Sequence, residues 1–357
     1  MKEDHIFYTL RLNDSNTWNF LLTKFHPDQQ DIYFSPEYYR LYEEFGDGQA
    51  RCFVYEKGKE LALYPFLINS VNSLGYELSD QYSDIQGAYG YNGIIYTSNE
   101  EFFVNDFYKA FNQYCIDNKI IAEFTRFHPL IDNSKFSEKA MDIVLDRKTT
   151  YVDLNRTYVN IFNSFQTTTR KQVKRCRNRH HMEVEVIEKD DYLIEDFYSI
   201  YIETMDRVQS IRYLYFNINY FKELILNTKS ALFIAKIEGK PIAAIIIFYN
   251  TVYVHGHLGG ALTNYLYTSP YSLLYSEIIR FGIERGCRYF HIGGGATNNP
   301  DDPLLKFKMN FSSTLSDFYV GKRIHNPEVY KNVVSQWEQK FPEKIEKYDK
   351  FLLKYRY

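Results

Sequence analysis

The side chains whose types and spacing most directly suggest chemistry are the cations of FNSFQTTTRKQVKRCRNRHH, residues 162–181. At the ~100° per residue of a helix, a basic row lies beside an apolar stripe. The apolar stripe comprises Phe162, Phe165, Thr169, Val173 and Cys176, and the basic row comprises Arg170, Lys174 and Arg177, extended by Lys171, Arg175 and Arg179. No Glu or Asp interleaves these cations, although a solvated helix face usually carries opposite charges four residues apart. The pattern favours phosphates of a nucleotide-linked substrate or of RNA, and a solvated face is the alternative.

A second basic site lies in ETMDRVQSIRYLYF, residues 203–216, where Arg207 and Arg212 fall at the end of an expected helix and in the following loop. A guanidinium there can clamp a carboxylate or a phosphate with two hydrogen bonds. A surface salt bridge to Glu203 or Asp206 explains the same residues equally well.

Metal and dinucleotide motifs are absent from the sequence. His255 and His257 lie on one face of an expected strand, but no nearby Asp, Glu or Cys supplies a third ligand, so we predict no metal site. The four cysteines lack metal or disulfide spacing and are expected to be reduced. The glycines of HIGGGATNN do not fit GxGxxG. The loop GHLGGALTNYLYTSPYS lacks the RxxGxG pyrophosphate cradle usual in acetyl-CoA enzymes, which counts against a simple CoA acetyltransferase.

The elements that must position these residues repeat in the two halves of the chain. In the first half we expect a helix from Ser35 as N-cap to Gly46 as stop, two strands joined at EKGKE, a helix over 102–120 and a strand over 121–127. In the second half we expect helices at 192–208 and 217–228, a hairpin through EGK, a strand at 251–260, a helix at 271–286 and a strand at 288–293. This order predicts an α/β (α+β) fold with two tandem domains like the Gcn5-related N-acetyltransferase (GNAT) fold, in which helices flank mixed central sheets.

Length and composition agree with two folded domains. The chain has 357 residues, 45% of them apolar and 24% charged, so each half can bury a core. We place the domains at residues 1–152 and 153–325, with a C-terminal helical segment at 326–357. The formal net charge of -3 argues against a global nucleic-acid-binding field. The longest apolar run, residues 241–249, is far below the ~20 residues that cross a bilayer, and a cytoplasmic location is the default.

Several segments together resemble the Fem-type transferases (FemABX family), which add amino acids to the peptide of a cell-wall precursor. The segments are TTTRKQVKRCRN, MDR, GCRYFHIGGG, LLKFKMNFSS and FYVGKRI, with YFSPEYYRLYEEFG and AYGYNGII in the first half. They cover residues 30–325 in order, and KFKMNF is the most specific. The resemblance implies two GNAT-like domains, the first binding the acceptor substrate and the second meeting an aminoacyl-tRNA donor, with no bound cofactor.

The resemblance also implies roles for single residues. Lys308, after Phe307, would stabilise the oxyanion that forms when an amine attacks the donor carbonyl, a role for which a preorganised cation is suited. Arg207 matches the position that grips the precursor's phosphate, and Tyr91 and Gly93 lie in the segment that forms part of the acceptor cleft. The other substrate-binding candidates are Arg170, Lys174 and Lys306.

Two departures from the family keep the substrate open. Tyr96 stands where cell-wall members often carry an acid, and GAYGYNG looks closer to relatives that act as N-acyltransferases in surface-polysaccharide chemistry. Our first hypothesis is therefore an acyl or aminoacyl transferase that acts on an amine of a nucleotide- or lipid-linked cell-envelope precursor. The alternatives are an acyl-CoA-dependent N-acyltransferase acting on an amino sugar, and a non-catalytic scaffold that binds a glycan precursor or RNA. We expect no DNA partner and no integral membrane association, and leave a peripheral membrane contact open.

Overall fold

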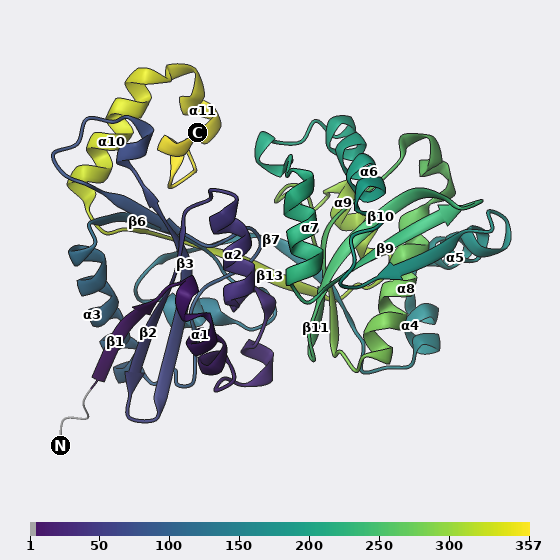
Figure 1. Cartoon of the computed structure of the whole chain (residues 1–357), viewed down its shortest axis with the longest axis horizontal. Coiled ribbons are helices and arrows are strands. Elements are labelled where there is room, and N and C mark those ends of the chain that lie inside the picture. The colour runs from purple at the N-terminus through teal and green to yellow at the C-terminus, as the bar shows by residue number, and fades with distance from the viewer. Residues whose placement is uncertain (1–4) are drawn as a thin grey trace. The chain divides into compact units, whose positions relative to one another are not determined.

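The computed structural model describes residues 5–357, which divide into two compact units (Figure 1). Within the described residues, unit 1 comprises 5–146 and Phe318–Tyr357, and unit 2 comprises Arg147–Asp317. The sequence-based boundaries lie at 152/153 and 325/326 instead. The difference arises because two strands, β7 (Asp142–Asp153) and β13 (Leu315–Ile324), each run from one unit into the other, and a hydrophobic pattern does not indicate where along a strand its contacts change.

Unit 1 is built on a mixed sheet whose strand order is β1-β2-β3-β4-β6-β13, with β5 paired to β3. The bounds are β1 His5–Leu10, β2 Gln49–Lys57, β3 Glu60–Ser70, β4 Ser83–Gln86, β5 Ile95–Tyr96 and β6 Ile120–Arg126. Strands β1 to β4 pair antiparallel in sequence, whereas β4 pairs parallel with β6. The connection between these parallel strands carries helix α3 (Glu101–Asp117).

Helices cover both faces of this sheet (Figure 1). Helix α3 packs aromatic residues such as Phe107 and Phe111 against Phe53 and Tyr64 of the sheet. Helices α1 (Ser15–Leu22) and α2 (Pro36–Glu44) cover the other face. Helix α2 begins as predicted, because the Ser35 hydroxyl accepts a hydrogen bond from an amide of the first turn.

The C-terminal segment completes unit 1. Helix α10 (Pro327–Lys340) buries Val333 and Trp337 fully in a cluster with residues of β6 and the β3–β4 connection. The short helix α11 (Ile345–Tyr348) follows, and the Tyr355 hydroxyl then donates to Oδ2 of Asp84 at 2.8 Å. The helical segment predicted at the C-terminus is thus present, and its apolar face belongs to the core of unit 1.

Unit 2 repeats the plan of unit 1. Its strands lie in the order β7-β12-β11-β10-β9-β8, with bounds β8 Glu183–Ile187, β9 Ser230–Ile237, β10 Lys240–Tyr249, β11 Tyr253–Ala261 and β12 Tyr289–Gly294. Strands β8 to β11 pair antiparallel in sequence, and β11 pairs parallel with β12 across helix α8 (Pro270–Glu284). The duplication that the sequence predicts is therefore present in the topology.

Two helical layers enclose the sheet of unit 2. Helices α4 (Tyr158–Ser164), α5 (Thr167–Asn178) and α8 share one core with the inward residues of β9 and β10. Helices α6 (Ile194–Arg207) and α7 (Ile218–Asn227) lie on the other face (Figure 1). Because β10 is covered on both faces, its sequence is a continuous apolar run rather than an alternating one.

Two helical features differ from the prediction. The single helix expected over 162–181 is broken, because Phe165 is extended between α4 and α5 and its ring is buried in the core. Helix α9 (Pro303–Met309) was not predicted at all. Within residues 5–357, no helix combines the length and the apolar character that crossing a membrane requires.

Candidate active site

Lys308 lies in the last turn of α9, and its side chain returns to the end of strand β12. The ammonium donates a hydrogen bond to the Gly294 carbonyl oxygen at 2.7 Å. A lysine ammonium carries three donors, so two N–H groups remain after this contact. The preceding Phe307 packs its ring against Tyr275 and Phe311, which anchors the helix that carries the lysine.

Asp302 fixes the start of α9 and the loop before it. Its Oδ1 accepts from the amides of Leu304 at 2.9 Å and Leu305 at 3.1 Å. Its Oδ2 accepts from the amide and the hydroxyl of Thr297, both at 2.9 Å. Burial opposes ionisation of this carboxylate, but these hydrogen bonds outweigh it and lower its pKa to about 2. Asp302 is therefore a charged N-cap that also ties the loop to the helix.

Gly293 and Gly294, which end β12, and Gly295, which follows it, let these side chains approach the strand. Gly293 has a φ of 91°, and a Cβ there would lie 3.2 Å from Nζ of Lys308. A Cβ on Gly295 would lie 2.6 Å from Cγ of Asp302. On the neighbouring strand β7, Arg147 donates to the Gly295 carbonyl oxygen at 2.9 Å. Close approach, rather than a dinucleotide loop, explains the GGG sequence.

The surroundings of Lys308 bring its pKa near neutrality. Burial is the largest cause and lowers the pKa to about 8, the charge of Asp302 opposes the change, and the charge of Arg147 adds to it. The Lys308 side chain as a whole is only partly buried, whereas the lowered pKa reflects the surroundings of its ammonium. The group is thus mostly a cation at pH 7 but loses its proton more easily than a surface lysine.

The sheet beside this group opens between its two parallel strands. Hydrogen-bonded pairing of β11 with β12 covers only Tyr253 to His255 against Tyr289 to His291. Beyond that point β11 continues to Ala261, while β12 pairs with β7 up to Gly294. Strands β11 and β12 therefore stop pairing before β12 reaches Gly294, the residue that Lys308 contacts.

Two predicted cationic elements meet the loop from Leu262 to Ser269, between β11 and α8. Arg207, at the end of α6, donates to the Ala261 carbonyl oxygen at 2.8 Å and to the Thr263 hydroxyl at 3.0 Å. Arg175, on α5, donates to the Tyr267 carbonyl oxygen at 3.2 Å. Within residues 5–357, neither Glu203 nor Asp206, the acids considered as salt-bridge partners, forms an ion pair with Arg207. The cations thus flank the loop in which acetyl-CoA enzymes usually place their pyrophosphate cradle.

The two basic residues singled out on α5 have different surroundings. Arg170 is half-buried and donates to the carbonyl oxygens of Asn163, at 3.0 Å, and Phe165. It therefore caps the last carbonyls of α4. Lys174 is exposed, and among residues 5–357 it has no hydrogen-bond or ion-pair partner. Of the remaining candidate cations, Lys306 is exposed and forms an ion pair with Asp301 at 2.9 Å.

Tyr91 and Gly93 belong to unit 1, in the loop between β4 and β5. The ring of Tyr91 contacts the rings of Tyr33 and Phe318, with centroid distances of 5.1 Å and 5.3 Å. Gly93 has a φ of 104°, and a Cβ there would lie 2.5 Å from Nδ2 of Asn133, whose amide donates to the Asn92 carbonyl oxygen at 2.9 Å. A tight, hydrogen-bonded loop thus presents the Tyr91 ring.

The HGH histidines are held by neighbours within unit 2. Nε2 of His257 lies 3.1 Å from the Tyr220 hydroxyl, and burial followed by the nearby charge of His255 lowers the pKa of His257 to about 3. Nδ1 of His255 lies 3.4 Å from Nδ1 of His291. His257 is therefore a neutral, hydrogen-bonded histidine near pH 7.

Sequence reasoning missed Asp302 and the close contacts that Gly293 and Gly295 make with Lys308 and Asp302. A signal for Asp302 was present, because an Asp followed by Pro303 is a typical helix start with the acid as N-cap and proline in the first turn. No local signal exists for the glycines, since their neighbours Lys308 and Asp302 come from a later helix.

Comparison with known proteins bears on the fold and on the domain in unit 2. A family model described as an acetyltransferase (GNAT) domain matches residues 163–308, which lie within unit 2. None of the curated proteins matches the sequence. Among solved structures, the chain is similar to FemX, with 12% identity and a TM-score of 0.69 over 91% of this chain and 99% of that chain.

Two further structures share the fold. A conserved protein of unknown function from Bacteroides thetaiotaomicron has 13% identity and a TM-score of 0.56, over 88% of this chain and 98% of that chain. A tandem GNAT protein from the clavulanic acid biosynthesis pathway has 8% identity and a TM-score of 0.54, over 91% of this chain and 99% of that chain. The chain therefore has a FemX-like fold of two tandem GNAT units and carries an acyltransferase domain, as the sequence predicted.

Proposed function

We propose that this acyltransferase forms an amide on an amine of a cell-envelope precursor, with an aminoacyl-tRNA as donor and with Lys308 stabilising the oxyanion. The observation that carries the proposal is the ammonium of Lys308, held by one hydrogen bond at 2.7 Å to Gly294 with two donors left over. Fixed donors aimed at a developing oxyanion are typically the largest catalytic contribution in acyl transfer.

The reaction requires no redox partner. The acceptor nitrogen attacks the ester carbonyl carbon of the aminoacyl-tRNA, so that a C–N bond forms and the carbonyl electron pair moves to oxygen beside Lys308. Collapse of this tetrahedral intermediate breaks the C–O bond to the ribose. The proton lost by the amine goes to the departing hydroxyl, directly or through water.

The exposed basic face of α5 supports a polyanionic donor. Lys171, Lys174, Arg175 and Arg179 are exposed, and α5 also borders the loop that follows β11 through Arg175. A face of this kind gains affinity for phosphates by releasing counterions. We assign Arg207, at the start of the same loop, to a phosphate of donor or acceptor.

The proposed class of acceptor rests on similarity to known proteins. The Fem-type segments of the sequence and the FemX-like fold support a peptidoglycan- or polysaccharide-linked amine, with the Tyr91 and Gly93 loop on the acceptor side. Between these two acceptors, the GAYGYNG segment favours the polysaccharide branch, whereas KFKMNF supports the Fem-type resemblance as a whole.

An acyl-CoA-dependent N-acyltransferase acting on an amino sugar is the second candidate. The GNAT domain match over residues 163–308 favours it, as do the cations around the loop between β11 and α8. In this case the bond that breaks is the C–S bond of the thioester, and the same lysine would stabilise the oxyanion.

A transfer assay distinguishes these functions. The full chain is incubated with labelled aminoacyl-tRNA or acetyl-CoA and with a nucleotide-linked muropeptide or an amino sugar, and the mass of the acceptor is measured. We expect an aminoacylated product that is lost in Lys308→Met. A product from acetyl-CoA alone would favour the second candidate. Precursor or RNA binding without any product, abolished by Lys174→Glu and unaffected by Lys308→Met, would identify a scaffold instead.

A further inference from the structure

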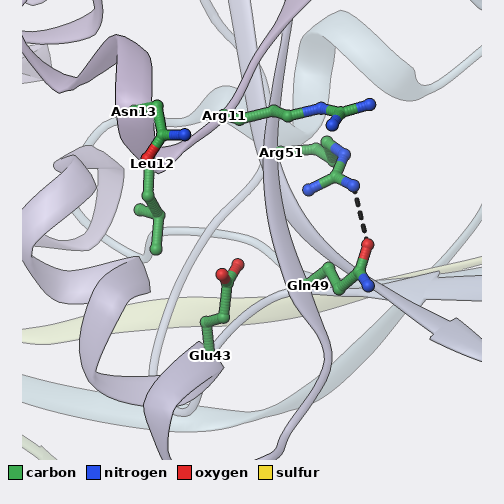
Figure 2. A pocket seen from close by; sticks show the side chains of 6 residues that line it. All are labelled: Arg11, Leu12, Asn13, Glu43, Gln49 and Arg51. Atoms are coloured by element: carbon green, nitrogen blue, oxygen red, sulfur yellow. Dashed lines mark hydrogen bonds between the residues drawn. The ribbon is translucent and has the colours of Figure 1, made fainter.

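A pocket in unit 1 has no role in the proposed reaction. Its volume is about 240 Å³, and it lies where the turn after β1 meets the C-terminal end of α2 and the first residues of β2 (Figure 2). The residues that line it are Arg11, Leu12, Asn13, Glu43, Gln49 and Arg51.

The side chains of Arg11 and Arg51 extend side by side into this region (Figure 2). Arg51 donates to the Gln49 side-chain oxygen and to the Ala50 carbonyl oxygen, both at 2.7 Å. Burial lowers the pKa of the Arg51 guanidinium, and the charge of Arg11 is the second cause. Two like charges are therefore held close together where water screens them incompletely.

The acid in the pocket offsets only part of this effect: the charge of Glu43 opposes the lowering of the Arg51 pKa, but it ranks after burial and the charge of Arg11. The Glu43 carboxylate accepts a hydrogen bond from the Ala50 amide, and no ion pair is described for it. The guanidinium of Arg11 has no hydrogen-bond or ion-pair partner among residues 5–357. A lining of two guanidiniums, two side-chain amides and one engaged carboxylate is suited to a ligand that brings negative charge and accepts several hydrogen bonds.

We propose that this pocket binds an oxyanion, a phosphate or carboxylate group of a small ligand. Guanidinium groups bind both anions through paired N–H donors, and Arg11 and Arg51 supply two such forks. Asn13 adds amide donors at the rim, and Leu12 contributes an apolar wall. The inference is independent of the proposed function, because every residue it uses belongs to unit 1 and Lys308 belongs to unit 2.

The test compares different anions at equal ionic strength. The thermal unfolding midpoint of the full chain is measured against increasing sodium phosphate, sodium acetate or sodium chloride, for the wild type, Arg11→Gln and Lys59→Gln. Lys59 is an exposed cation at the β2–β3 turn, at the opposite end of β2 from Gln49 and Arg51, so that its variant matches the lost charge. Arg11 is also exposed, and we expect its variant to fold.

We expect phosphate, acetate or both to raise the midpoint saturably in the wild type and in Lys59→Gln, with at least a tenfold weaker apparent affinity in Arg11→Gln. A rise with phosphate alone identifies a phosphate ligand, and a rise with acetate at similar affinity identifies a carboxylate ligand. Phosphate also stabilises proteins by exclusion from their surfaces, so the comparison between variants decides the result. Equal curves for wild type and Arg11→Gln, the same curve in chloride, or no saturable rise with either anion would overturn the proposal.

Discussion

The ammonium of Lys308 and the carbonyl oxygen of Gly294 are joined by a hydrogen bond of 2.7 Å that connects helix α9 to the end of strand β12. The contact fixes the position of a cation beside the point where the parallel strands β11 and β12 have ceased to pair. It restricts the ammonium without using all its donors, which is what electrostatic stabilisation of an oxyanion requires.

Replacing Lys308 should remove catalysis while preserving the fold. In Lys308→Met we expect kcat to fall by about 10²–10³-fold, the range for the loss of one oxyanion donor. The unfolding midpoint should not fall, because the variant loses one hydrogen bond but also removes a cation that burial disfavours. Lys331→Met, which removes an exposed lysine of α10, serves as the control for charge. Full transfer activity in Lys308→Met would refute its catalytic role.

The pH dependence of the rate should follow the ionisation of Lys308. Its pKa is lowered to about 8, so the active cation is lost as the pH rises through about 8. The acceptor amine titrates as well, and the useful quantity is the ratio of the wild-type rate to that of Lys308→Arg, whose guanidinium stays charged. This ratio should fall between pH 7 and 9. A ratio that rises over this range would instead make Lys308 a general base.

The lowered pKa of Lys308 should also make the unfolding free energy depend on pH. Because the pKa of Lys308 is lower in the folded state than the ordinary 10.5, the unfolded chain binds more protons between about pH 8 and 10.5. The contribution of Lys308 to stability therefore improves as the pH rises through this window. The difference in unfolding free energy between the wild type and Lys308→Met, measured by urea denaturation, should change in that direction, and a flat difference would contradict it.

Gly293 should be sensitive to a methyl group because of its neighbour. Gly293→Ala and Gly286→Ala both put a side chain at positive φ, 91° and 72°, which destabilises by about 1–2 kcal/mol. Only the first adds a Cβ 3.2 Å from Nζ of Lys308, since nothing lies within 4 Å of the second. We expect similar losses of stability but a lower kcat only in Gly293→Ala. Equal kcat values would mean that the ammonium adjusts without consequence.

Asp302 should hold α9 and the preceding loop in place. Asp302→Ala removes an N-cap that accepts from the amides of Leu304 and Leu305, and we expect a loss of about 0.5–2 kcal/mol, measured by urea denaturation. Asp301→Ala, which removes an exposed acid paired with Lys306, is the matched control. The pKa of Asp302 is about 2, below the ordinary 3.8, so its contribution should be complete above about pH 4 and decline as the pH falls toward 2.

Substitutions at Arg170 and Lys174 should have different effects, the first on stability and the second on tRNA binding. Arg170→Ala removes donors to the Asn163 and Phe165 carbonyl oxygens and should lower the unfolding midpoint. Lys174→Glu should leave the midpoint unchanged but weaken tRNA binding and reduce the slope of log affinity against log salt by about 1 or more. Lys331→Glu controls for net charge. Weaker binding in Arg170→Ala alone would remove α5 from the donor site.

Much of the fold follows from local sequence patterns. The start of α2 at Ser35 and Pro36 and the hairpin through Gly58 follow from capping and turn chemistry, which act over a few residues. Repetition of that order predicted the tandem GNAT units, which the similarity to a tandem GNAT protein and the GNAT domain match confirm. The basic face of α5 was visible because helical periodicity alone sets which side chains share a face.

Tertiary contacts decided what the local patterns could not. Phe165 breaks the predicted helix because its ring enters the core, and Arg170 donates to the carbonyl oxygen of Phe165. The C-terminal helix joins unit 1 because Trp337 is buried there. The position of the Lys308 ammonium depends on Gly294, in a different element. Sequence determined residue types and periodicities, whereas hydrogen bonds between distant segments decided which of those residues act together.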